Sequence, residues 1–574
     1  MSHLELSEQE IIRRESLKEL QKLGINPFPA EEYPVTHYSQ DIHKGFEENP
    51  EAYQEVSLAG RIMGRRIMGN ASFAELKDKE GRIQIYVRRD DLCPGEDKTL
   101  YNTVFKKLLD IGDIIGVKGH VFKTKMGETS IYVKSLQVLS KSLRPLPVVK
   151  EKDGQVYDAF SDPEQRYRQR YVDLIVNDEV RELFRKRTRL INSMREFFNE
   201  KDYLEVETPI LQPIPGGAAA RPFETHHNTL DMPLYLRIAN ELYLKKLIVG
   251  GFEGVYEFGK DFRNEGMDRS HNPEFTVMEI YVAYKDYKWM MDFTEKMLEK
   301  VAMDLDGTTQ VEVDGKTIDF KRPYKRISMI EAIHEHTDID ISGMDEQQIR
   351  QTCDELGIEY DASMGKGKMI DEIFSQKCED QYIQPTFIMD YPVEMSPLCK
   401  KHRDNPELTE RFELMVNGAE IANAYSELND PIDQLERFQE QLKLSEKGDD
   451  EAMFIDQDFV RALEYGMPPT SGMGIGIDRL TMLMTNQASI QEVIFFPQMR
   501  PEKKAERDGE EKYTELGIPS EWVPVIQKAG YLKAEDLKSA NPNKLHQDLC
   551  GMNKKHKLGL TNPRPEDVKK WTEQ

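Results

Sequence analysis

The chain has 574 residues, of which 39% are hydrophobic and 32% charged, and its formal net charge is −25. This length predicts several domains, and the composition is that of a soluble protein with packed cores. No apolar run approaches the roughly 20 residues that a membrane span needs, and residues 1–10 lack the basic start and apolar run of a secretory signal. The five cysteines are scattered without a C-x-x-C pair, which argues against a zinc site or a disulfide framework. We therefore predict a cytoplasmic protein with no membrane partner.

The strongly negative charge argues against a protein that coats nucleic acid indiscriminately. The charge is unevenly distributed, however. Residues 61–144 hold 17 Lys and Arg against 10 Asp and Glu, a local net charge of +7. A basic region in an acidic chain is typical of a confined contact with RNA.

The N-terminal segment, residues 1–54, is predicted to contain a helix over residues 6–23, which Gly24 ends. Residues 55–145 then alternate apolar and polar positions in five short strands, with a helix-like segment at 101–109 between the third and fourth. This order predicts a closed barrel of the OB type, which binds single-stranded nucleic acid on its outer face. The candidates for base and phosphate contacts are Arg66, Phe73, Gln84 and Glu128. Phe73 could equally belong to the barrel core.

A proline-stiffened linker at 142–147 precedes the largest predicted domain, residues 146–499. An Arg- and Tyr-rich segment at 162–175 is followed by an amphipathic helix at 180–201 and a strand that Pro209 ends. The loop 214–223 contains Gly216 and Gly217, where backbone can approach a ligand closely. Glu241 follows in an apolar helical run, where an unpaired carboxylate is unfavourable.

A hairpin is predicted next, with strands at 255–262 and 275–282 around a polar loop. Its sequence, FRNEG…HNPEFT, concentrates arginine, glutamate, histidine and asparagine side chains at one end. Arg263 presents the five-donor fork that suits a phosphate or a carboxylate. A solvated hairpin tip without function is the alternative interpretation.

Residues 307–398 are predicted to be a helical insertion without chemistry. Polar residues reappear on two strand-like pieces at 411–430, where Glu413, Glu420 and Glu427 are predicted to share one sheet face. Three such carboxylates repel one another unless cations lie between them, and hard oxygen ligands suit Mg²⁺ held together with phosphates. A glycine-rich strand at 472–476 then leads into a helix that starts near Asp478 and Arg479.

The remaining residues, 500–574, read as a charged linker followed by short helices separated by Gly and Pro. They predict a helix-hairpin-helix-like extension with a basic cluster at Lys554, Lys555, His556 and Lys557. We interpret it as a module for RNA or partner binding, with a purely stabilising appendage as the alternative.

The hairpin motif, the helix–strand–proline segment before it and the GMGIGIDR segment after it resemble the three signature motifs of class II aminoacyl-tRNA synthetases. The version of each resembles that of the lysyl enzymes, and residues 55–145 resemble the anticodon-binding barrel of the lysyl, aspartyl and asparaginyl enzymes. The resemblance implies an α+β fold with a six- to seven-stranded antiparallel sheet flanked by helices, a homodimer, an N-terminal OB-fold barrel and a small C-terminal helical module. It also implies ATP-dependent ligation of L-lysine to tRNA(Lys) through a lysyl-adenylate, with release of AMP and pyrophosphate.

The resemblance further implies a role for each matching residue. Arg263 and Arg479 are the implied catalytic residues, and Glu413 and Glu420 are the implied ligands of Mg²⁺, with more than one ion per subunit. Phe275 and Arg479 are expected to sandwich the adenine. The implied ATP-binding residues are Arg263, Glu265, His271, Asn272, Phe275, Glu413 and Arg479. The implied lysine-binding residues are Gly216, Glu241, Arg263, Glu279, Tyr281, Asn423, Tyr425, Glu427 and Gly474. Anticodon binding is implied for Arg66, Phe73, Gln84 and Glu128.

Three other functions compete with this interpretation. A ligase of the same fold that lysylates a protein would reuse the pocket, but the known examples lack the barrel. An aspartyl or asparaginyl enzyme would share fold and barrel, whereas the ELYL and SELND segments argue against it. A catalytically inactive RNA-binding protein is disfavoured because every expected catalytic position is filled. Tyr425 departs from many relatives, which have Phe, and its hydroxyl needs a partner.

Overall fold

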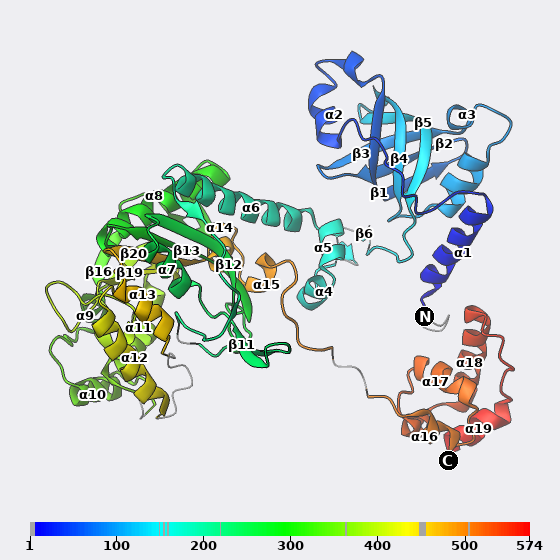
Figure 1. Cartoon of the computed structure of the whole chain (residues 1–574). Helices are drawn as coiled ribbons and strands as arrows, with labels where there is room; N and C mark the ends of the chain where they lie inside the picture. Colours follow the sequence, from blue (N-terminus) through cyan, green and yellow to red (C-terminus); the bar gives the residue numbers. More distant parts are fainter. Residues whose placement is uncertain are drawn as a thin grey trace. The chain divides into compact units, whose positions relative to one another are not determined.

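The architecture comes from a computed structural model that describes residues 6–573 except 148–149, 153–154, 158–159, 219, 362–363, 447–454 and 503–505. The chain divides into two compact units, Met1–Ala159 together with Pro501–Gln574, and Phe160–Arg500. Figure 1 shows the first unit in blue to cyan and in orange to red, and the second in cyan to orange. Within the described ranges, no helix is long and apolar enough to cross a membrane.

The N-terminal part contains a closed five-stranded barrel, with strand order β1-β2-β3-β5-β4. Alternating residues of each strand point inward and form one apolar core, which includes Ile62, Ile85 and Val133. The predicted OB-type barrel and the helix between its third and fourth strands are thereby confirmed. The strands are β1 (Val56–Met68), β2 (Ala71–Lys77), β3 (Arg82–Arg88), β4 (Ile114–Lys123) and β5 (Thr129–Ser140). The helices are α1 (Glu8–Lys22), α2 (Ser39–Gly45), η2 (Pro50–Tyr53), α3 (Arg89–Leu92) and η3 (Leu100–Leu108), and a β6 (Lys150–Lys152) and β7 (Gln155–Tyr157) pair follows.

The C-terminal part of the first unit is a helical module with a core of its own. Trp522, Leu537, Leu545 and Leu549 are buried in it together. Gly517 and Gly530 adopt positive φ angles where segments turn, as the Gly-separated pattern predicts. Its helices are α16 (Glu510–Thr514), η6 (Ser520–Trp522), α17 (Val523–Lys528), η7 (Ala534–Ser539), α18 (Pro542–His556) and α19 (Pro565–Glu573).

The second unit is built on an eight-stranded sheet of order β16-β17-β18-β19-β20-β13-β12-β8. The six central strands are antiparallel, whereas β16 and β8 each pair in parallel at the two edges. The six antiparallel strands agree with the predicted antiparallel sheet of six to seven strands, and two short parallel edge strands extend the sheet to eight. The strands are β8 (Leu204–Glu205), β12 (Gly254–Phe262), β13 (Glu274–Ala283), β16 (Lys325–Ser328), β17 (Thr386–Met389), β18 (Arg411–Val416), β19 (Ala419–Ser426) and β20 (Thr470–Gly476).

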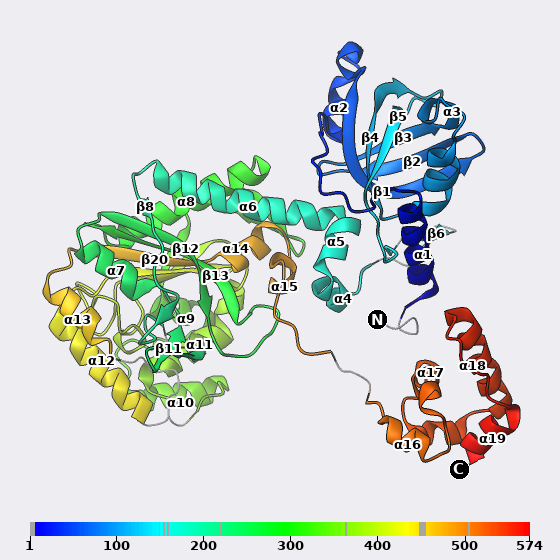
Figure 2. The same cartoon turned by 45° about the vertical axis from the view of Figure 1, so that its right-hand side comes forward.

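The two faces of this sheet differ in character. One face packs on the long helices α6 (Asp178–Asn199) and α8 (Tyr287–Asp306), where Met194, Met278 and Ile475 belong to one apolar core. Both helices run along that face in Figure 2. The opposite face carries polar residues and glycines, and α7 (Glu241–Val249), α12 (Pro431–Glu446) and α13 (Gln457–Glu464) pack at one end of it. This second face holds the candidate site.

Residues 307–398 are not wholly helical. Strands β16 and β17 belong to the main sheet, and a hairpin of β14 (Gln310–Val313) and β15 (Lys316–Asp319) precedes them. The predicted helices occur as α9 (Met329–Thr337) and α10 (Glu346–Leu356), followed by α11 (Lys366–Lys377), η4 (Glu379–Gln381) and η5 (Val393–Met395). The other elements of the unit are β9 (Leu211–Gln212), β10 (Glu224–His227), β11 (Met232–Leu236) and α14 (Ile477–Met484).

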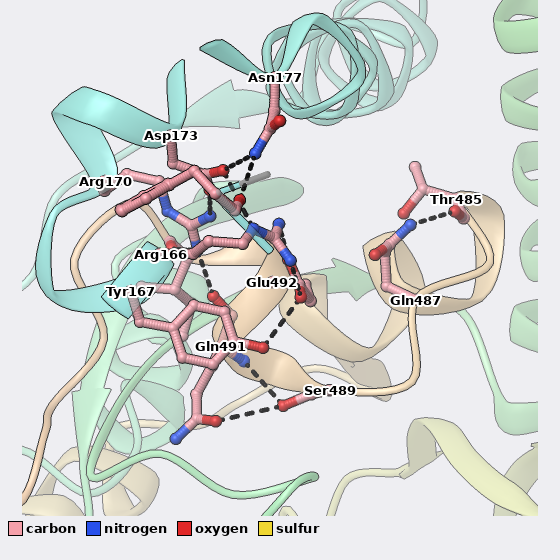
Figure 3. Close-up of polar contacts among 12 residues, drawn as sticks. Arg166, Tyr167, Arg170, Asp173, Asn177, Thr485, Gln487, Ser489, Gln491 and Glu492 are labelled. Carbon is pink, nitrogen blue, oxygen red and sulfur yellow. Dashed lines mark hydrogen bonds and ion pairs between the residues drawn. The ribbon is translucent and has the colours of Figure 1, made fainter. Parts of the chain in front are cut away.

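A polar network joins the beginning and the end of the second unit (Figure 3). It links α4 (Pro163–Arg168) and α5 (Arg170–Val176) to α15 (Ile490–Val493). Arg166 donates from both terminal nitrogens to Glu492, at 3.0 and 2.8 Å, and Tyr167 donates to the same carboxylate at 2.9 Å. Asp173 accepts from Arg166 and from the fully buried Arg170. The Arg- and Tyr-rich segment thus fixes the entry of the chain to its exit.

Candidate active site

The polar face of the sheet is organised by strand register. One row of paired residues crosses five strands, from Glu257 through Glu279, Gly474 and Asn423 to Glu413. A second row, two residues along each strand, runs from Val255 through Tyr281, Gly472 and Tyr425 to Arg411. Because residues two apart on a strand share a face, both rows point the same way. Residues of five strands, from three distant stretches of sequence, therefore meet on one surface.

The glycines of β20 keep the centre of this surface free of side chains. A Cβ at Gly472 would lie well inside 3.0 Å of both Glu427 and the Tyr281 ring. At Gly474 the nearest atom to an added Cβ is a methylene of Glu279 at 3.7 Å, an ordinary contact distance. Close packing therefore explains Gly472 but not Gly474. The missing side chain at Gly474 leaves room for a ligand between β13 and β19.

Three buried carboxylates, those of Glu241, Glu279 and Glu427, surround the side-chain-free surface over Gly472 and Gly474, which we call the glycine strip. Tyr425 donates from its hydroxyl to Glu241 Oε2 at 2.7 Å, and Tyr281 donates to Glu279 Oε2 at 2.9 Å. The Tyr425 hydroxyl thus has the partner that its departure from Phe requires. Glu427 is compensated less completely, since its charged partner among the described residues is Lys245, which forms an ion pair with Oε2. A buried carboxylate in that state is suited to a cationic ligand.

The titration of these acids reflects their burial. Burial, followed by the charges of Asp261 and Glu241, raises the pKa of Glu279 well above its ordinary value. Burial raises the pKa of Glu427 to about 8, although the ammonium of Lys245 opposes that shift. Both carboxyl groups therefore bind their protons more strongly than solvated carboxyl groups do. This is typical of sites in which a bound cation compensates the buried negative charge.

Sequence reasoning missed Lys245. Its Nζ lies 2.5 Å from Glu241 Oε1 and also forms an ion pair with Glu427 Oε2, and its side chain is fully buried. The i to i+4 spacing of Glu241 and Lys245 on one predicted helix was an available signal. The contact with Glu427 was not visible, because it requires the whole sheet to form.

A second missed group supports the sheet beneath the site. The buried guanidinium of Arg237 pairs with Glu257 at 2.8 Å and with Asp261 at 3.1 Å. Glu257 also accepts from Thr208 Oγ1 at 2.7 Å and from Asn240 Nδ2 at 3.1 Å. These contacts satisfy Glu257 from within the protein, whereas burial still raises the pKa of Asp261 to about 6 although Arg237 opposes the shift.

The hairpin loop is placed beside the strip. The guanidinium of Arg263 lies 5.2 Å from the centre of the Phe275 ring, and its Nε has no hydrogen-bond partner in the part of the chain described. Glu265 and His271 are exposed, and His271 contacts Asp268 through Nδ1 and Arg479 through Nε2. Asn272 is buried, donates to the Glu274 carbonyl at 2.6 Å and accepts from Gln498 N at 3.3 Å. Asn272 therefore shapes the loop.

Glu413 and Glu420 occupy the other end of the strip. A bulge between the Leu414–Ala422 and Met415–Glu420 pairs displaces the β19 register beside Glu420. Arg411 donates to Glu413 Oε1 at 2.6 Å, and Arg479 lies 3.5 Å from Glu420 Oε2. Two arginines and a lysine of this chain therefore already lie beside Glu413, Glu420 and Glu427. The protein itself thus supplies part of the positive charge that these three carboxylates require.

The same two acids nevertheless fit a metal carried by phosphates. Burial, with the Glu420 charge next, raises the pKa of Glu413 to about 7 although Arg411 opposes the shift. Two hard carboxylates whose mutual repulsion the arginines offset only in part suit Mg²⁺ that takes its other ligands from phosphates and water. No group of three or more His, Cys, Asp or Glu placed to hold a metal by themselves occurs within the described ranges.

The loop 214–223 lies against the start of α7, although Ala219 falls outside the described residues. Gly217 has a φ of +92°, and an added Cβ would lie 3.0 Å from Ala239 and 3.3 Å from Glu241. Gly216 is buried against Leu242. The backbone of this loop thus passes directly beside Glu241.

The four barrel candidates lie outside the barrel core. Phe73 is half-buried on the outer face, 5.0 Å from the Tyr86 ring, so the alternative that it is a core residue is wrong. Its strand partner Arg66 is exposed, and Gln84 donates to Ser130 Oγ at 2.8 Å. Glu128 is exposed in the turn after β4. Sequence analysis missed the other rings of this face, Tyr86, His120, Phe122 and Tyr132.

Both parts of this architecture, the barrel and the sheet that carries the glycine strip, match known protein families. Residues 162–500, more than half of the chain, match the family model described as tRNA synthetases class II (D, K and N), and residues 56–139 match that of an OB-fold nucleic acid binding domain. A protein of Porphyromonas gingivalis named Lysine–tRNA ligase is 69% identical over 575 residues, covering 100% of this chain and 99% of that protein. Proteins of the same name are 67% identical in Azobacteroides pseudotrichonymphae, over 87% of this chain and 99% of the relative, and 66% identical in Christiangramia forsetii, over 88% and 89%. The chain belongs to the class II tRNA synthetases and, within them, to the family of lysine–tRNA ligases.

Proposed function

We propose that this protein joins L-lysine to tRNA(Lys) in two steps, first forming lysyl-adenylate and pyrophosphate from lysine and ATP, then transferring the lysyl group to the tRNA and releasing AMP. The observation that carries the proposal is the set of three buried carboxylates around the open strip at Gly474. Lysine has two ammonium groups, and a pocket with excess buried negative charge favours it over neutral amino acids, which would leave those charges unpaired. Membership of the lysine–tRNA ligase family supports the same substrate.

In this proposal the ammonium groups of lysine divide between two ends of the pocket. Glu427, with Glu279 and Tyr281, receives the side-chain ammonium, because Lys245 pairs with one oxygen of Glu427 and the other lies over Gly472. Glu241 and the Gly216 carbonyl receive the α-ammonium. Asn423, Tyr425 and the Gly474 backbone line the space between. The unpartnered Nε of Arg263 points to a role on the lysine carboxylate.

ATP lies along the other half of the strip. The lysine carboxylate is ionised at neutral pH, so its attack on the α-phosphorus needs no general base. Catalysis then comes from orientation and from neutralising charge on the phosphate oxygens, by Arg263 at the α-phosphate and Arg479 at the γ-phosphate. Phe275 offers the adenine a ring face, although the structure places Arg263, and not Arg479, over that ring. Glu265 and His271 complete the nucleotide site, and Asn272 holds the loop.

Magnesium enters with ATP in this scheme. Glu413 and Glu420 would hold more than one ion between them and the phosphates, where the ions supply neutralisation of phosphate charge. Arg411 keeps Glu413 oriented toward that position through its 2.6 Å contact.

The tRNA anticodon is proposed to bind the outer face of the barrel. Phe73 provides a stacking surface, Gln84 and Glu128 provide base-edge contacts and Arg66 a phosphate contact, as single-strand-binding barrels require. The cluster of rings behind Phe73 supports this face as the binding surface.

We further propose a homodimer that acts in the cytoplasm. Support for a dimer comes from exposed apolar residues near the short edge strand β8 and the loops after it, Leu204, Leu211, Leu230 and Phe252. Support for the compartment comes from the tRNA substrate and from five cysteines that are all free. The domain boundaries also stay predictions: 1–54, 55–145, 146–499 with an insertion at about 307–398, and 500–574 as an RNA- or partner-binding extension.

The direct test is ATP–pyrophosphate exchange with each of the twenty amino acids and no tRNA. Exchange that depends on lysine, and that Arg263→Ala abolishes, is the expected result. Exchange with aspartate or asparagine would contradict the pocket assignment while leaving the family unaffected. Absence of exchange with every amino acid would instead indicate a binding protein.

A further inference from the structure

Lys245 is the one cation placed inside the acidic pocket by the described part of the chain. It lies on α7, one helical turn after Glu241, with its ammonium between Glu241 and Glu427. Burial alone would lower the pKa of Lys245, but the two carboxylates raise it to about 12, so the ammonium stays charged at physiological pH. The next residue, Lys246, is partly exposed and pairs with Asp458 at 2.8 Å on the other side of the helix.

An ordinary buried ion pair does not account for this arrangement. A single ammonium here faces two carboxylates, and a third, Glu279, lies close enough to Glu241 for their charges to interact. With all three acids ionised the pocket has a charge of −3, and Lys245 reduces it to −2. Two negative charges match the two ammonium groups of one lysine molecule. A buried ion pair is also no more stabilising than apolar packing, which weakens a purely structural explanation.

The contacts of Lys245 also decide which oxygens are left for a ligand. Glu241 is held through both oxygens, Oε1 by Lys245 and Oε2 by Tyr425. Lys245 pairs with Glu427 through Oε2, and the other oxygen, Oε1, lies over Gly472, whose backbone N–H also bonds to this carboxylate. Lys245 thus orients both carboxylates from the protein side and leaves the other side to the substrate.

Resting on the proposed function, we infer that Lys245 is a positioning residue for lysine recognition, which fixes Glu241 and Glu427 and sets the pocket to a charge that one doubly cationic amino acid balances. Removing its charge leaves three carboxylates for two ammonium groups. One of them must then keep its proton, and a protonated acid no longer attracts an ammonium group. The loss is therefore one of lysine binding, with ATP binding unaffected.

The test compares Lys245→Gln, which removes the charge but keeps hydrogen-bonding capacity, with Lys245→Arg, which keeps the charge. Lys246→Met is the matched control one residue along the same helix. Lysine-dependent ATP–pyrophosphate exchange gives the KM values for lysine and ATP, and thermal unfolding reports whether each variant is folded. For Lys245→Gln we expect the KM for lysine to rise at least about 30-fold, with the KM for ATP within about threefold of the parent, since truncating one partner of a buried charge pair is costly. Lys245→Arg is expected to lose less, and Lys246→Met to match the parent.

The pH profile separates positioning from a general loss of packing. Lysine binding by the parent should improve as pH rises toward the pKa of Glu427, and in Lys245→Gln this improvement should move to higher pH because a cation that favours the ionised carboxylate is gone. The charged and titratable groups that face Glu427 are Lys245, Glu241, Tyr281, Glu279, Tyr425 and Cys399.

Each outcome decides the inference. A folded Lys245→Gln with an unchanged KM for lysine and an unchanged pH profile would overturn it. Failure of both Lys245 variants to fold would also overturn it, because the residue would then be structural. A parent protein that shows no exchange with lysine would refute the proposed function itself, a result that the variants cannot produce.

Discussion

The glycine strip offers the sharpest test of the site, because alanine substitutions at Gly472 and Gly474, on one face of β20, should be harmful for different reasons. In Gly472→Ala the new methyl group would overlap a carboxylate oxygen of Glu427 and the Tyr281 ring, both buried. Neither can retreat without moving the pocket. In Gly474→Ala the nearest atom is 3.7 Å away, so the protein accommodates the methyl group and only a ligand meets it.

The magnitudes follow from the packing. Forcing a methyl group into a closed site costs about 1–3 kcal/mol, from which the reduced entropy of the unfolded chain recovers about 0.4–1 kcal/mol. Gly472→Ala should therefore lower the free energy of unfolding by roughly 1–2 kcal/mol, whereas Gly474→Ala should match the parent or exceed it by a few tenths. For activity, Gly474→Ala should reduce lysine-dependent exchange by at least about 10-fold, because a displacement of about 1 Å in a bound reactant is sufficient for losses of that order or larger.

Urea unfolding and pyrophosphate exchange, measured on both variants, check these values. A Gly474→Ala protein with full activity would refute the argument that the strip is ligand space. A Gly472→Ala protein as stable as the parent would refute the packing argument and with it the placement of Glu427.

Three further predictions concern charge and the barrel. Glu413→Gln should abolish exchange yet remove a pH-dependent loss of stability. A carboxyl with a pKa raised to about 7 binds its proton more tightly in the folded state, so the free energy of unfolding of the parent should fall as the pH rises from about 4.5 to 7. The midpoint temperature of unfolding, measured across that range without ATP, should change less with pH in the variant. Arg237→Met should cost about 3–5 kcal/mol in urea unfolding, since it strands Glu257 and Asp261, whereas Lys325→Met, which breaks an exposed pair with Glu335, should cost less than about 1 kcal/mol. Phe73→Ala should raise the KM for tRNA in aminoacylation and leave tRNA-independent exchange unchanged; an equal loss in both assays would contradict the assignment of the barrel face.

The elements that sequence reasoning located correctly are those with strong local patterns. The hairpin of β12 and β13 alternates apolar and polar residues around a polar loop, and β20 pairs glycines with a following helix start. The edge strand β8 has two residues and β16 has four, too short for periodicity to identify. These residues are strands because of the neighbours they pair with, so the sequence could not predict that the sheet has eight strands.

Site residues were predictable where a motif carries them and not where the partner is remote. From the sequence, Lys245 is one charged residue among several on a helix. Its partner Glu427 is distant in the sequence and comes close only when the sheet forms. Arg411 lies two residues from Glu413 on a predicted strand, so their shared face was foreseeable, but the compensation of Glu413 by an arginine was not. The sequence could not predict whether Phe73 points into the barrel or outward, because the alternation of apolar and polar residues alone does not say which face of the sheet turns inward.

The remaining question is why a protein would bury so many acids that raise one another's pKa. Arg237 pairs with both acids of β12, which have no ligand role in the proposed scheme, yet burial still raises the pKa of Asp261 to about 6. Glu279, Glu427 and Glu413, which border the strip, also retain raised pKa values despite Tyr281, Lys245 and Arg411. Stability is lost at those three positions, and each lies where a cationic partner, an ammonium or a metal ion with ATP, is proposed to bind. At these three positions the substrates are proposed to supply the compensation that the protein leaves incomplete, so binding free energy and the pH dependence of folding have the same origin there.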